Sequence, residues 1–355
     1  MARDGKDRGK AEPRPEEILG VRDVLGREMN GVPVLLVIAL ALSLFTDTFL
    51  TGTNMDNLGR QVSIYAIIAI GQLLVIITGG IDLSVGSVVG LSGVIAALTV
   101  FETAGGGSVV LAIVLALLTG AATGAISGLL VAVVKMPPFI VTLGFMGIAR
   151  GVTLLLTGGR TVQPLPGAFA EIAGGETLGI ANLIWITLLV TAVVWFALRR
   201  TVWGRYVYAV GSNKESARLA GVPVRSVQVS VYALSGTLAA LGGVLLASRL
   251  SNGVPTAGTG YELQAIAACV IGGASLFGAR GTALGTLLGA LIVGMLNNGG
   301  TLLGVDPFYL QIAIGALILA AVAVDQLQAR RTRRASEPAR PPGSARELTA
   351  TGGSA

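Results

Sequence analysis

Three kinds of residue are scarce in this 355-residue chain: histidine is absent, cysteine occurs once, as Cys269, and charged residues make up 12% of the sequence. These shortages exclude a disulfide framework, a zinc site built from the usual ligands and a catalytic triad that depends on histidine. The sequence also lacks the G-x-x-x-x-G-K-[ST] loop that binds nucleotide phosphates. We therefore expect no catalytic residue, no metal site and no cofactor bound by this chain, and a protein that is not an enzyme.

Apolar residues dominate the rest of the chain, since 53% of it is hydrophobic and the mean hydropathy is +0.77. This composition predicts a membrane protein, because a soluble core cannot bury so much apolar surface. The 51 glycines agree with this, since small residues let helices pack closely in lipid. The first apolar run begins at Val32, behind a charged stretch too long for the start of a cleavable signal peptide. We expect residues 1–31 to remain as a cytoplasmic segment.

Ten segments are apolar enough to cross a membrane as helices, each of which needs about 20 residues. They predict an all-α, polytopic membrane domain over residues 32–325, with glycine-rich breaks at 79–84 and 272–282. The expected spans are 32–50, 62–79, 84–101, 109–133, 138–157, 181–198, 227–248, 263–279, 282–298 and 307–325. Residues 326–355 are rich in Arg, Pro and Ser and are expected to form a disordered cytoplasmic tail.

The basic residues predict the orientation, because Lys and Arg collect on the cytoplasmic side of a membrane. With both termini inside, 21 of the 25 basic residues fall in cytoplasmic segments. The remaining four are Arg60, Arg150, Arg160 and Arg249. We therefore expect a multi-pass protein of the cytoplasmic membrane, in contact with membrane lipid. The net charge of +6 follows from this topology, and we expect no nucleic-acid partner.

Two pairs of similar segments indicate an internal repeat. "GGIDLSVGSVVG" at Gly79 is similar to "GGASLFGARGTALG" at Gly272, and "PPFIVTLGFMGI" at Pro137 is similar to "DPFYLQIAIGAL" at Asp306. Chance similarity in glycine-rich sequence is the alternative. Five spans per copy would put the second copy upside down, so we expect two inverted five-helix repeats, with the two Gly-Gly breaks as corresponding interruptions that mark the site.

The longest cytoplasmic loop between expected spans, residues 199–226, contains "NKESARLAG". This stretch predicts a short helix that Asn213 caps and Gly221 ends, with Glu215 in its first turn. A solvated loop that only carries positive charge is the alternative. The apolar residues Ala217, Leu219, Ala220 and Val222 argue against that alternative, because they form a face that a soluble partner would cover.

The same stretch leads to a resemblance. "ESARLAG" resembles the EAA-xxx-Gly coupling helix of ABC importer permeases, with Ser216 in place of the middle alanine. The segments "IITGGIDLSVGS", "PPFIVTLG", "GRYVYAVGSN", "PTAGTGYELQAIAA" and "GGASLFGARG" are similar to those of ribose-type monosaccharide permeases, from about Asn54 to Asp325.

The resemblance implies a set of partners. Two permease subunits, here expected to form a homodimer, would enclose the pore, and an external binding protein would deliver the sugar. ATP would be bound and hydrolysed by a separate ATPase subunit that engages the coupling helix. The residues expected to couple to it are Gly211, Asn213, Glu215, Ala217, Arg218, Leu219 and Gly221.

Asp82, between the first Gly-Gly and an apolar run, has two interpretations that the sequence leaves open. As a cap it would accept hydrogen bonds at the start of the third span, with Ser84 assisting. As a pathway residue it would contact sugar hydroxyls or control the inner exit, since an ionisable residue at membrane depth is a functional candidate. Both roles are compatible with each other.

A sugar has many hydroxyls and no charge, so its pathway should offer amides, hydroxyls and aromatic faces. Besides Asp82, the candidates of this kind are Gln72, Phe139, Thr142, Asn297, Asn298, Phe308 and Gln311. The alternative for each is helix-to-helix hydrogen bonding or packing against lipid. We also expect Arg150 to have a structural role and Glu262 to lie on an outer loop.

These features together predict the permease subunit of an ABC importer for a ribose-like monosaccharide. A permease for branched-chain amino acids or nucleosides is the nearest alternative. A secondary transporter with its own coupling ion is less favoured, because such proteins use acidic or histidine relays within the membrane.

Overall fold

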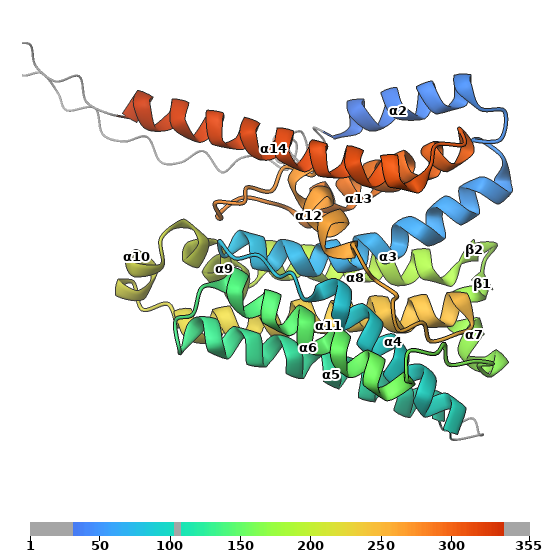
Figure 1. The fold of residues 1–355 in the computed structure, drawn as a ribbon. Coiled ribbons are helices and arrows are strands. Elements are labelled where there is room, and N and C mark those ends of the chain that lie inside the picture. The colour runs from blue at the N-terminus through green and yellow to red at the C-terminus, as the bar shows by residue number, and fades with distance from the viewer. Residues whose placement is uncertain (1–30, 103–107, 337–355) are drawn as a thin grey trace, which may run out of the picture.

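The computed structural model describes residues 31–102 and 108–336, and the described part is almost entirely helical (Figure 1). Of the expected N-terminal segment, residues 1–30 lie outside the described residues. Two short strands, β1 (Glu176–Thr177) and β2 (Ile180–Ala181), form a two-stranded antiparallel hairpin. The helices are α2 (Val32–Phe45), α3 (Gly52–Ile77), α4 (Val85–Glu102), α5 (Ser108–Ala132), α6 (Pro138–Thr157), α7 (Gly167–Gly174), α8 (Asn182–Arg200), α9 (Val202–Ser212), α10 (Lys214–Leu219), α11 (Val224–Leu250), α12 (Tyr261–Ile271), α13 (Ala283–Leu302) and α14 (Pro307–Ser336).

Six of these helices are long and apolar enough to cross a membrane: α3, α5, α6, α8, α11 and α13. Shorter apolar helices in α2, α4, α12 and α14 occupy the other four segments in which spans were expected. The described part is therefore a polytopic, all-α membrane protein, as the composition predicts. That all ten segments cross the membrane, as two inverted sets of five, stays a prediction.

Three helix boundaries differ most from those expected. α3 begins at Gly52, ten residues before the expected span, because the Thr51 hydroxyl accepts a hydrogen bond from the backbone N–H of Asn54 at 3.4 Å and caps the helix. α12 ends at Ile271, where Gly272 and Gly273 stop it, and does not continue to residue 279. α14 continues to Ser336, so residues 326–336 are helical and the prediction of disorder there is wrong. Their Gln, Leu, Ala and Arg residues favour helix, and the first proline after Pro307 is Pro338.

α5 and α11 pack with their backbones in contact. The glycines Gly120, Gly124 and Gly128 recur every fourth residue along α5 and face α11. A Cβ atom on Gly120 would collide with the carbonyl of Gly236, and one on Gly124 with the carbonyl of Tyr232. This close approach is the small-residue packing that the glycine content predicts, and it fixes α11 as a central helix of the bundle.

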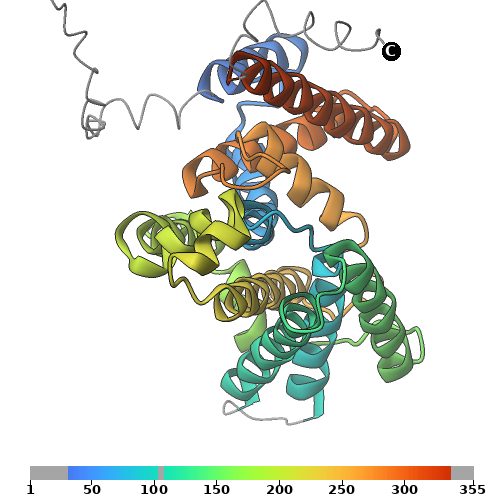
Figure 2. The same ribbon diagram turned by 90° about the vertical axis from the view of Figure 1, so that its left-hand side faces the viewer.

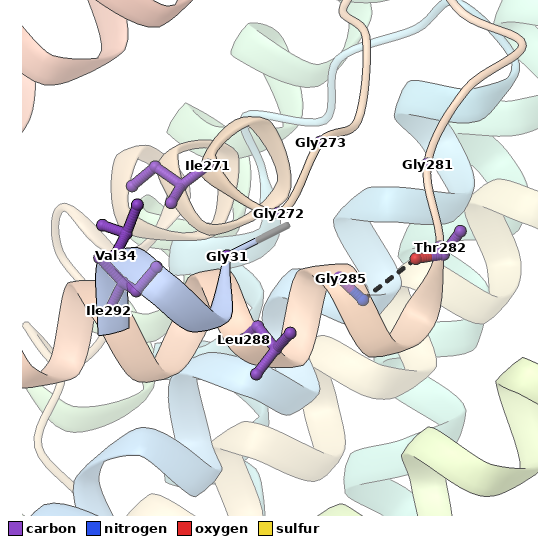
Figure 3. A pocket seen from close by; sticks show the side chains of 10 residues that line it. All are labelled: Gly31, Val34, Ile271, Gly272, Gly273, Gly281, Thr282, Gly285, Leu288 and Ile292. Carbon is purple, nitrogen blue, oxygen red and sulfur yellow. Dashed lines mark hydrogen bonds between the residues drawn. The ribbon is translucent and has the colours of Figure 1, made fainter. Parts of the chain in front are cut away.

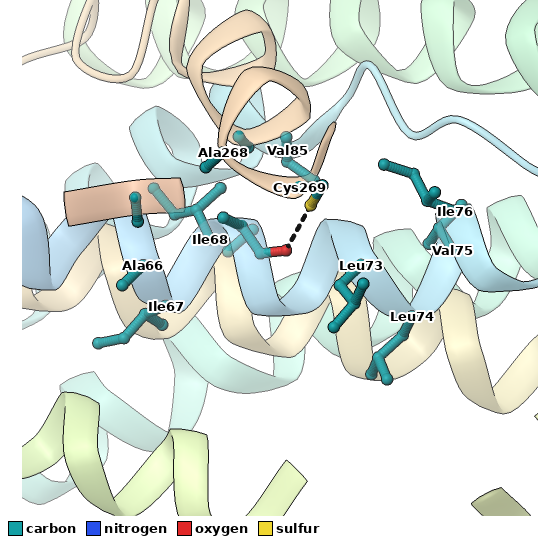
Figure 4. Close-up of a cluster of buried hydrophobic side chains, with 14 of the residues drawn as sticks. Ala66, Ile67, Ile68, Leu73, Leu74, Val75, Ile76, Val85, Ala268 and Cys269 are labelled. Carbon is teal, nitrogen blue, oxygen red and sulfur yellow. Dashed lines mark hydrogen bonds between the residues drawn. The ribbon is translucent and has the colours of Figure 1, made fainter. Parts of the chain in front are cut away.

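The largest hydrophobic cluster is centred on α3, whose residues 62–77 are all buried. Figure 4 shows its Ile68 beside Ala268 and Cys269 of α12. The thiol of Cys269 donates to the carbonyl of Ala69 at 3.2 Å, so the single cysteine joins two helices of the core.

The two ends of the bundle carry different elements. Figure 1 shows α9 and α10 at one end and α7 with the strands at the other. Viewed along the helices, α6 and α14 lie on the same side of the molecule (Figure 2). These two helices contain the "PPFIVTLG" and "DPFYLQIA" segments of the suspected repeat.

Candidate functional site between two interrupted helices

The first interruption is residues 78–84, where the chain leaves α3 and returns into the bundle before α4 begins (Figure 1). Backbone that is not helical needs other hydrogen-bond partners at membrane depth, because lipid supplies none. Gln72 of α3 provides two: with its amide oriented to satisfy both groups, its nitrogen donates to the Asp82 carbonyl at 2.9 Å and its oxygen accepts from the Asp82 N–H at 3.1 Å. The Thr142 hydroxyl of α6 donates to the Ile81 carbonyl at 3.1 Å.

The Asp82 carboxylate is buried, with only 1% of the residue exposed, and accepts three hydrogen bonds. One oxygen accepts from the Ser84 N–H at 2.9 Å and from the Ser84 hydroxyl at 2.6 Å, and the other accepts from the Ser235 hydroxyl of α11 at 3.2 Å. Ser84 is the N-cap residue of α4, because its carbonyl accepts the first helical hydrogen bond, from the Val88 N–H. Asp82 lies two residues before this cap and holds Ser84 in place. The negative charge of Asp82 also stabilises the N-terminus of α4.

The second interruption is residues 251–260, between α11 and α12. Ser251, Gly258 and Gly260 have positive φ angles of 52°, 74° and 83°, which prevent a continuous helix. Arg150 of α6 holds this segment, since its guanidinium donates to the Pro255 carbonyl at 2.6 Å and to the Ala257 carbonyl at 3.1 Å. The expected structural role of Arg150 is therefore a specific one: it satisfies carbonyls of non-helical backbone.

The two interruptions meet where α4 and α12 begin. A Cβ atom on Gly86 of α4 would collide with the Gly258 carbonyl and with the Glu262 carboxylate of α12. One on Gly90, a turn later, would lie 2.8 Å from the Ala257 carbonyl. Glu262 is half-buried in the first turn of α12, so its expected position on an outer loop is wrong. The Pro- and Gly-rich stretch "NGVPTAGTG" was the signal in the sequence that could have located this interruption.

The Gly-Gly break at 272 forms a third irregular segment, which joins α12 to α13 and contacts the first break. The Ala279 N–H donates to the Ile77 carbonyl at 2.9 Å, and a Cβ atom on Gly278 would lie 3.2 Å from the Gly79 nitrogen. A cavity of about 240 Å³ lies beside this break, lined mainly by glycines and aliphatic residues (Figure 3). Its Thr282 accepts a hydrogen bond from the Gly285 N–H at 3.0 Å and caps α13.

α9 packs directly on both Gly-Gly breaks. A Cβ atom on Gly211 would collide with the carbonyl of Ile77, the last residue of α3, and would lie 2.8 Å from the Ala279 nitrogen. The Tyr208 hydroxyl donates to the Gly281 carbonyl at 2.7 Å. The segment expected to bind a soluble partner is therefore in contact with the segments that interrupt the bundle.

α10 has the caps that the sequence predicts. The Asn213 side chain accepts from the Ser216 N–H at 2.9 Å, and Gly221 has a φ of 82°. Arg218 and Glu215 form an exposed ion pair at 2.5 Å. The hydrogen bonds from Arg218, and then its positive charge, hold the pKa of Glu215 below its usual value. The expected apolar face is divided, because Ala217 is buried against the body while Leu219 is 75% exposed. Val222 is also partly buried against the core.

Comparison with known proteins agrees with this architecture. Residues 54–322 match the family described as branched-chain amino acid transport system / permease component. The chain belongs to this family of transport permeases. It is 44% identical to a ribose import permease protein of Escherichia coli strain K12, over 84% of this chain and 93% of that protein. It is 46% identical to a ribose import permease protein of Bacillus subtilis (82% and 90%) and 40% identical to an L-arabinose ABC transporter permease protein of Azospirillum brasilense (86% and 88%). No solved structure matches the chain.

These relatives confirm the resemblance to ribose-type ABC permeases, and with the apolar helices they make the protein a multi-pass permease of the cytoplasmic membrane. As the permease of an ABC importer, it works with an ATPase subunit and with a binding protein.

Of the remaining pathway candidates of the permease, Phe139 lies one turn before Thr142 on α6, and the others lie on α13 and α14. Asn298 exchanges hydrogen bonds of 2.8 and 3.1 Å with Asn54 of α3, and the Asn297 amide donates to the Val293 carbonyl of its own helix at 2.9 Å. Phe139 of α6 and Phe308 and Gln311 of α14 are exposed. The structure thus brings three of the eight candidates together at the first interruption and leaves three on outward faces.

Proposed function

We propose that the protein is the permease subunit of an importer that moves a monosaccharide across the cytoplasmic membrane. The relatives named for ribose and L-arabinose support a sugar as substrate. A branched-chain amino acid is the alternative that the family description raises, and a nucleoside or an ion-coupled mechanism is less favoured. The chain itself binds no cofactor in this proposal, since ATP is bound and hydrolysed by the partner ATPase.

The contact of Gly211 with the end of α3 is the observation that carries the mechanism. The ATPase engages α10 through Leu219 and the capped ends formed by Asn213 and Gly221, and movement of α10 passes along α9. Because Gly211 touches the Ile77 carbonyl and Tyr208 is bonded to Gly281, α9 moves both Gly-Gly breaks together. That movement changes the position of Asp82 and the start of α4, which alternates access to the pathway.

The second permease subunit, most simply another copy of this chain, packs on the side that α6 and α14 share (Figure 2). Both helices have exposed aromatic residues, Phe139 and Phe308, and Gln311 adds an exposed amide. Cβ atoms on Gly144, Gly147 and Gly151 of α6 would meet nothing within 4 Å among the residues that the structure describes, which leaves room for a packing partner from the second copy. The pathway runs between the two copies. Asn298 is a helix-packing residue in this arrangement, and Asn297 is a weaker candidate for the pathway.

The orientation places both termini and α10 in the cytoplasm, with the binding protein at the opposite end, near α7. This assignment rests on the distribution of basic residues. A cysteine introduced at Ser216 should react with a membrane-impermeant maleimide only in inside-out vesicles. Labelling of that cysteine in intact cells would reverse the orientation.

The coupling proposal is tested with two exposed leucines at opposite ends of the molecule. Leu219→Asp should abolish copurification of the ATPase and uptake of radiolabelled sugar, because it puts a charge on the surface that the ATPase covers. Leu178→Asp, in the β1–β2 turn, is the matched control and should keep the ATPase bound. Normal uptake by the Leu219→Asp variant would reject the role of α10.

Uptake of ribose, L-arabinose, leucine and adenosine by the wild-type importer identifies the substrate class.

A further inference from the structure

A cleft of about 640 Å³ lies beside α10, at the end of the bundle expected to face the cytoplasm. We call it the basic cleft. It is formed by the α5–α6 connection, α10 and the first turns of α11, so it lies where membrane helices begin and end. The residues that line it are Val131, Ala132, Lys135, Met136, Pro137, Pro138, Lys214, Glu215, Arg218, Val224, Arg225 and Gln228.

Positive charge dominates the basic cleft. It contains four cationic side chains and one carboxylate, Glu215, which is already paired with Arg218. Within the described residues, no carboxylate lies within ion-pair distance of Lys135, Lys214 or Arg225. Four cations and a single carboxylate leave the cleft with a net positive charge, which provides a site for an anion.

The other half of the lining is apolar and continues onto a surface that faces lipid. Val133 and Val134, which lie between the end of α5 and Lys135, are 50% and 60% exposed. Lys135 thus joins the apolar surface to the basic cleft, as expected for a lysine at the level of the headgroups. A molecule with an anionic head and an apolar tail matches this combination of cations and exposed valines.

We propose that the basic cleft binds the headgroup of an anionic phospholipid from the inner leaflet. Lys135 and Arg225 contact the phosphate, and Lys214 adds to the positive electrostatic potential of the cleft. The acyl chains leave past Val133 and Val134. The proposal rests on the orientation given under the proposed function. Leu219, through which the ATPase is proposed to engage α10, does not line the cleft.

Native mass spectrometry of the purified full-length permease tests this site. The protein is exchanged into detergent containing equal amounts of phosphatidylglycerol and phosphatidylcholine, and the lipids that stay bound are counted. The wild type should retain phosphatidylglycerol in preference. The variant K135Q/R225Q should lose about tenfold or more in this preference, since each basic residue near the surface contributes to anionic lipid binding.

The matched control is R200Q/R205Q, which removes two exposed charges from the same cytoplasmic segment outside the cleft and should retain the wild-type preference. Equal retention by K135Q/R225Q and the wild type would overturn the proposal, as would an equal loss in the control. Displacement of phosphatidylglycerol by millimolar inorganic phosphate would also overturn it, because the site would then bind the free anion. The measurement uses no sugar and no ATPase, so its failure leaves the transport proposal standing.

Discussion

The two interruptions at the centre of the bundle solve the same physical problem with side chains of opposite character. At residues 78–84 the non-helical backbone is held by a neutral amide, a hydroxyl and the hydrogen-bonded carboxylate of Asp82. At residues 251–260 it is held by the cation of Arg150, and Glu262 lies at the adjacent helix start. The first segment presents N–H and hydroxyl donors to an anion, whereas the second presents carbonyls to a cation. A charge within a membrane domain therefore does not by itself identify a transport residue.

The contact between the first turn of α4 and the second interruption should be the most sensitive position. Gly86→Val would place side-chain atoms where the Gly258 carbonyl and the Glu262 carboxylate lie, and backbone cannot move away cheaply in a packed bundle. We expect a loss of roughly 4 kcal/mol or more, seen as aggregated protein in size-exclusion chromatography after detergent extraction. Gly167→Val, at the start of α7, is the control, because a Cβ atom there meets no atom within 4 Å in the described part, and it should leave the purified subunit monodisperse. A monodisperse, thermally stable Gly86→Val protein would contradict the close approach.

Removal of the cation should have the next largest effect. Arg150→Leu leaves the carbonyls of Pro255 and Ala257 without their charged donor, which costs roughly 2–5 kcal/mol. The thermal unfolding midpoint of the purified subunit measures this loss, and Arg150→Lys should recover part of it. If the Leu and Lys variants unfold together at the wild-type temperature, the second interruption does not depend on this side chain.

The neutral amide of the first interruption should matter somewhat less. Gln72→Leu keeps most of the volume but leaves the N–H and carbonyl of Asp82 unpaired, a loss of roughly 2 kcal/mol by the same thermal measurement. Gln72→Glu retains one acceptor and should fall between the Leu variant and the wild type. Equal stability of all three proteins would show that the Asp82 backbone has other partners.

The smallest expected effect separates the two interpretations of Asp82. Asp82→Asn retains an acceptor for Ser84 and gains a donor for Ser235, so stability should fall by only about 1 kcal/mol, largely through loss of the charge near the α4 N-terminus. If the carboxylate only anchors Ser84, sugar uptake per folded molecule should stay close to that of the wild type. A stable Asp82→Asn protein that transports no sugar would assign the charge itself to the pathway.

Sequence patterns predict the parts of this fold that depend on local chemistry. The apolar segments locate the membrane helices, Asn213 and Gly221 locate α10, and Gly79 and Gly272 locate two of the breaks. The expected spans leave residues 249–262 as a connection, but no local pattern predicts that 251–260 packs against Gly86 and Gly90 of α4. The partners of Gln72, Thr142 and Arg150 are backbone atoms distant in sequence, so no local pattern predicts them. The Arg, Pro and Ser content of residues 326–355 does not predict the continuation of α14 past residue 325, because the prolines lie only after Ser336 and the residues before them favour helix.

The burial of Cys269 has a consequence for experiment. Its thiol is inaccessible to solvent and is bonded to the Ala69 carbonyl in the middle of the core. The natural protein therefore already serves as a cysteine-free background for thiol reagents in its folded state. Engineered cysteines would be the only thiols to accept a fluorophore or a spin label. The distance between two such labels could follow the transport cycle without any change to the native core.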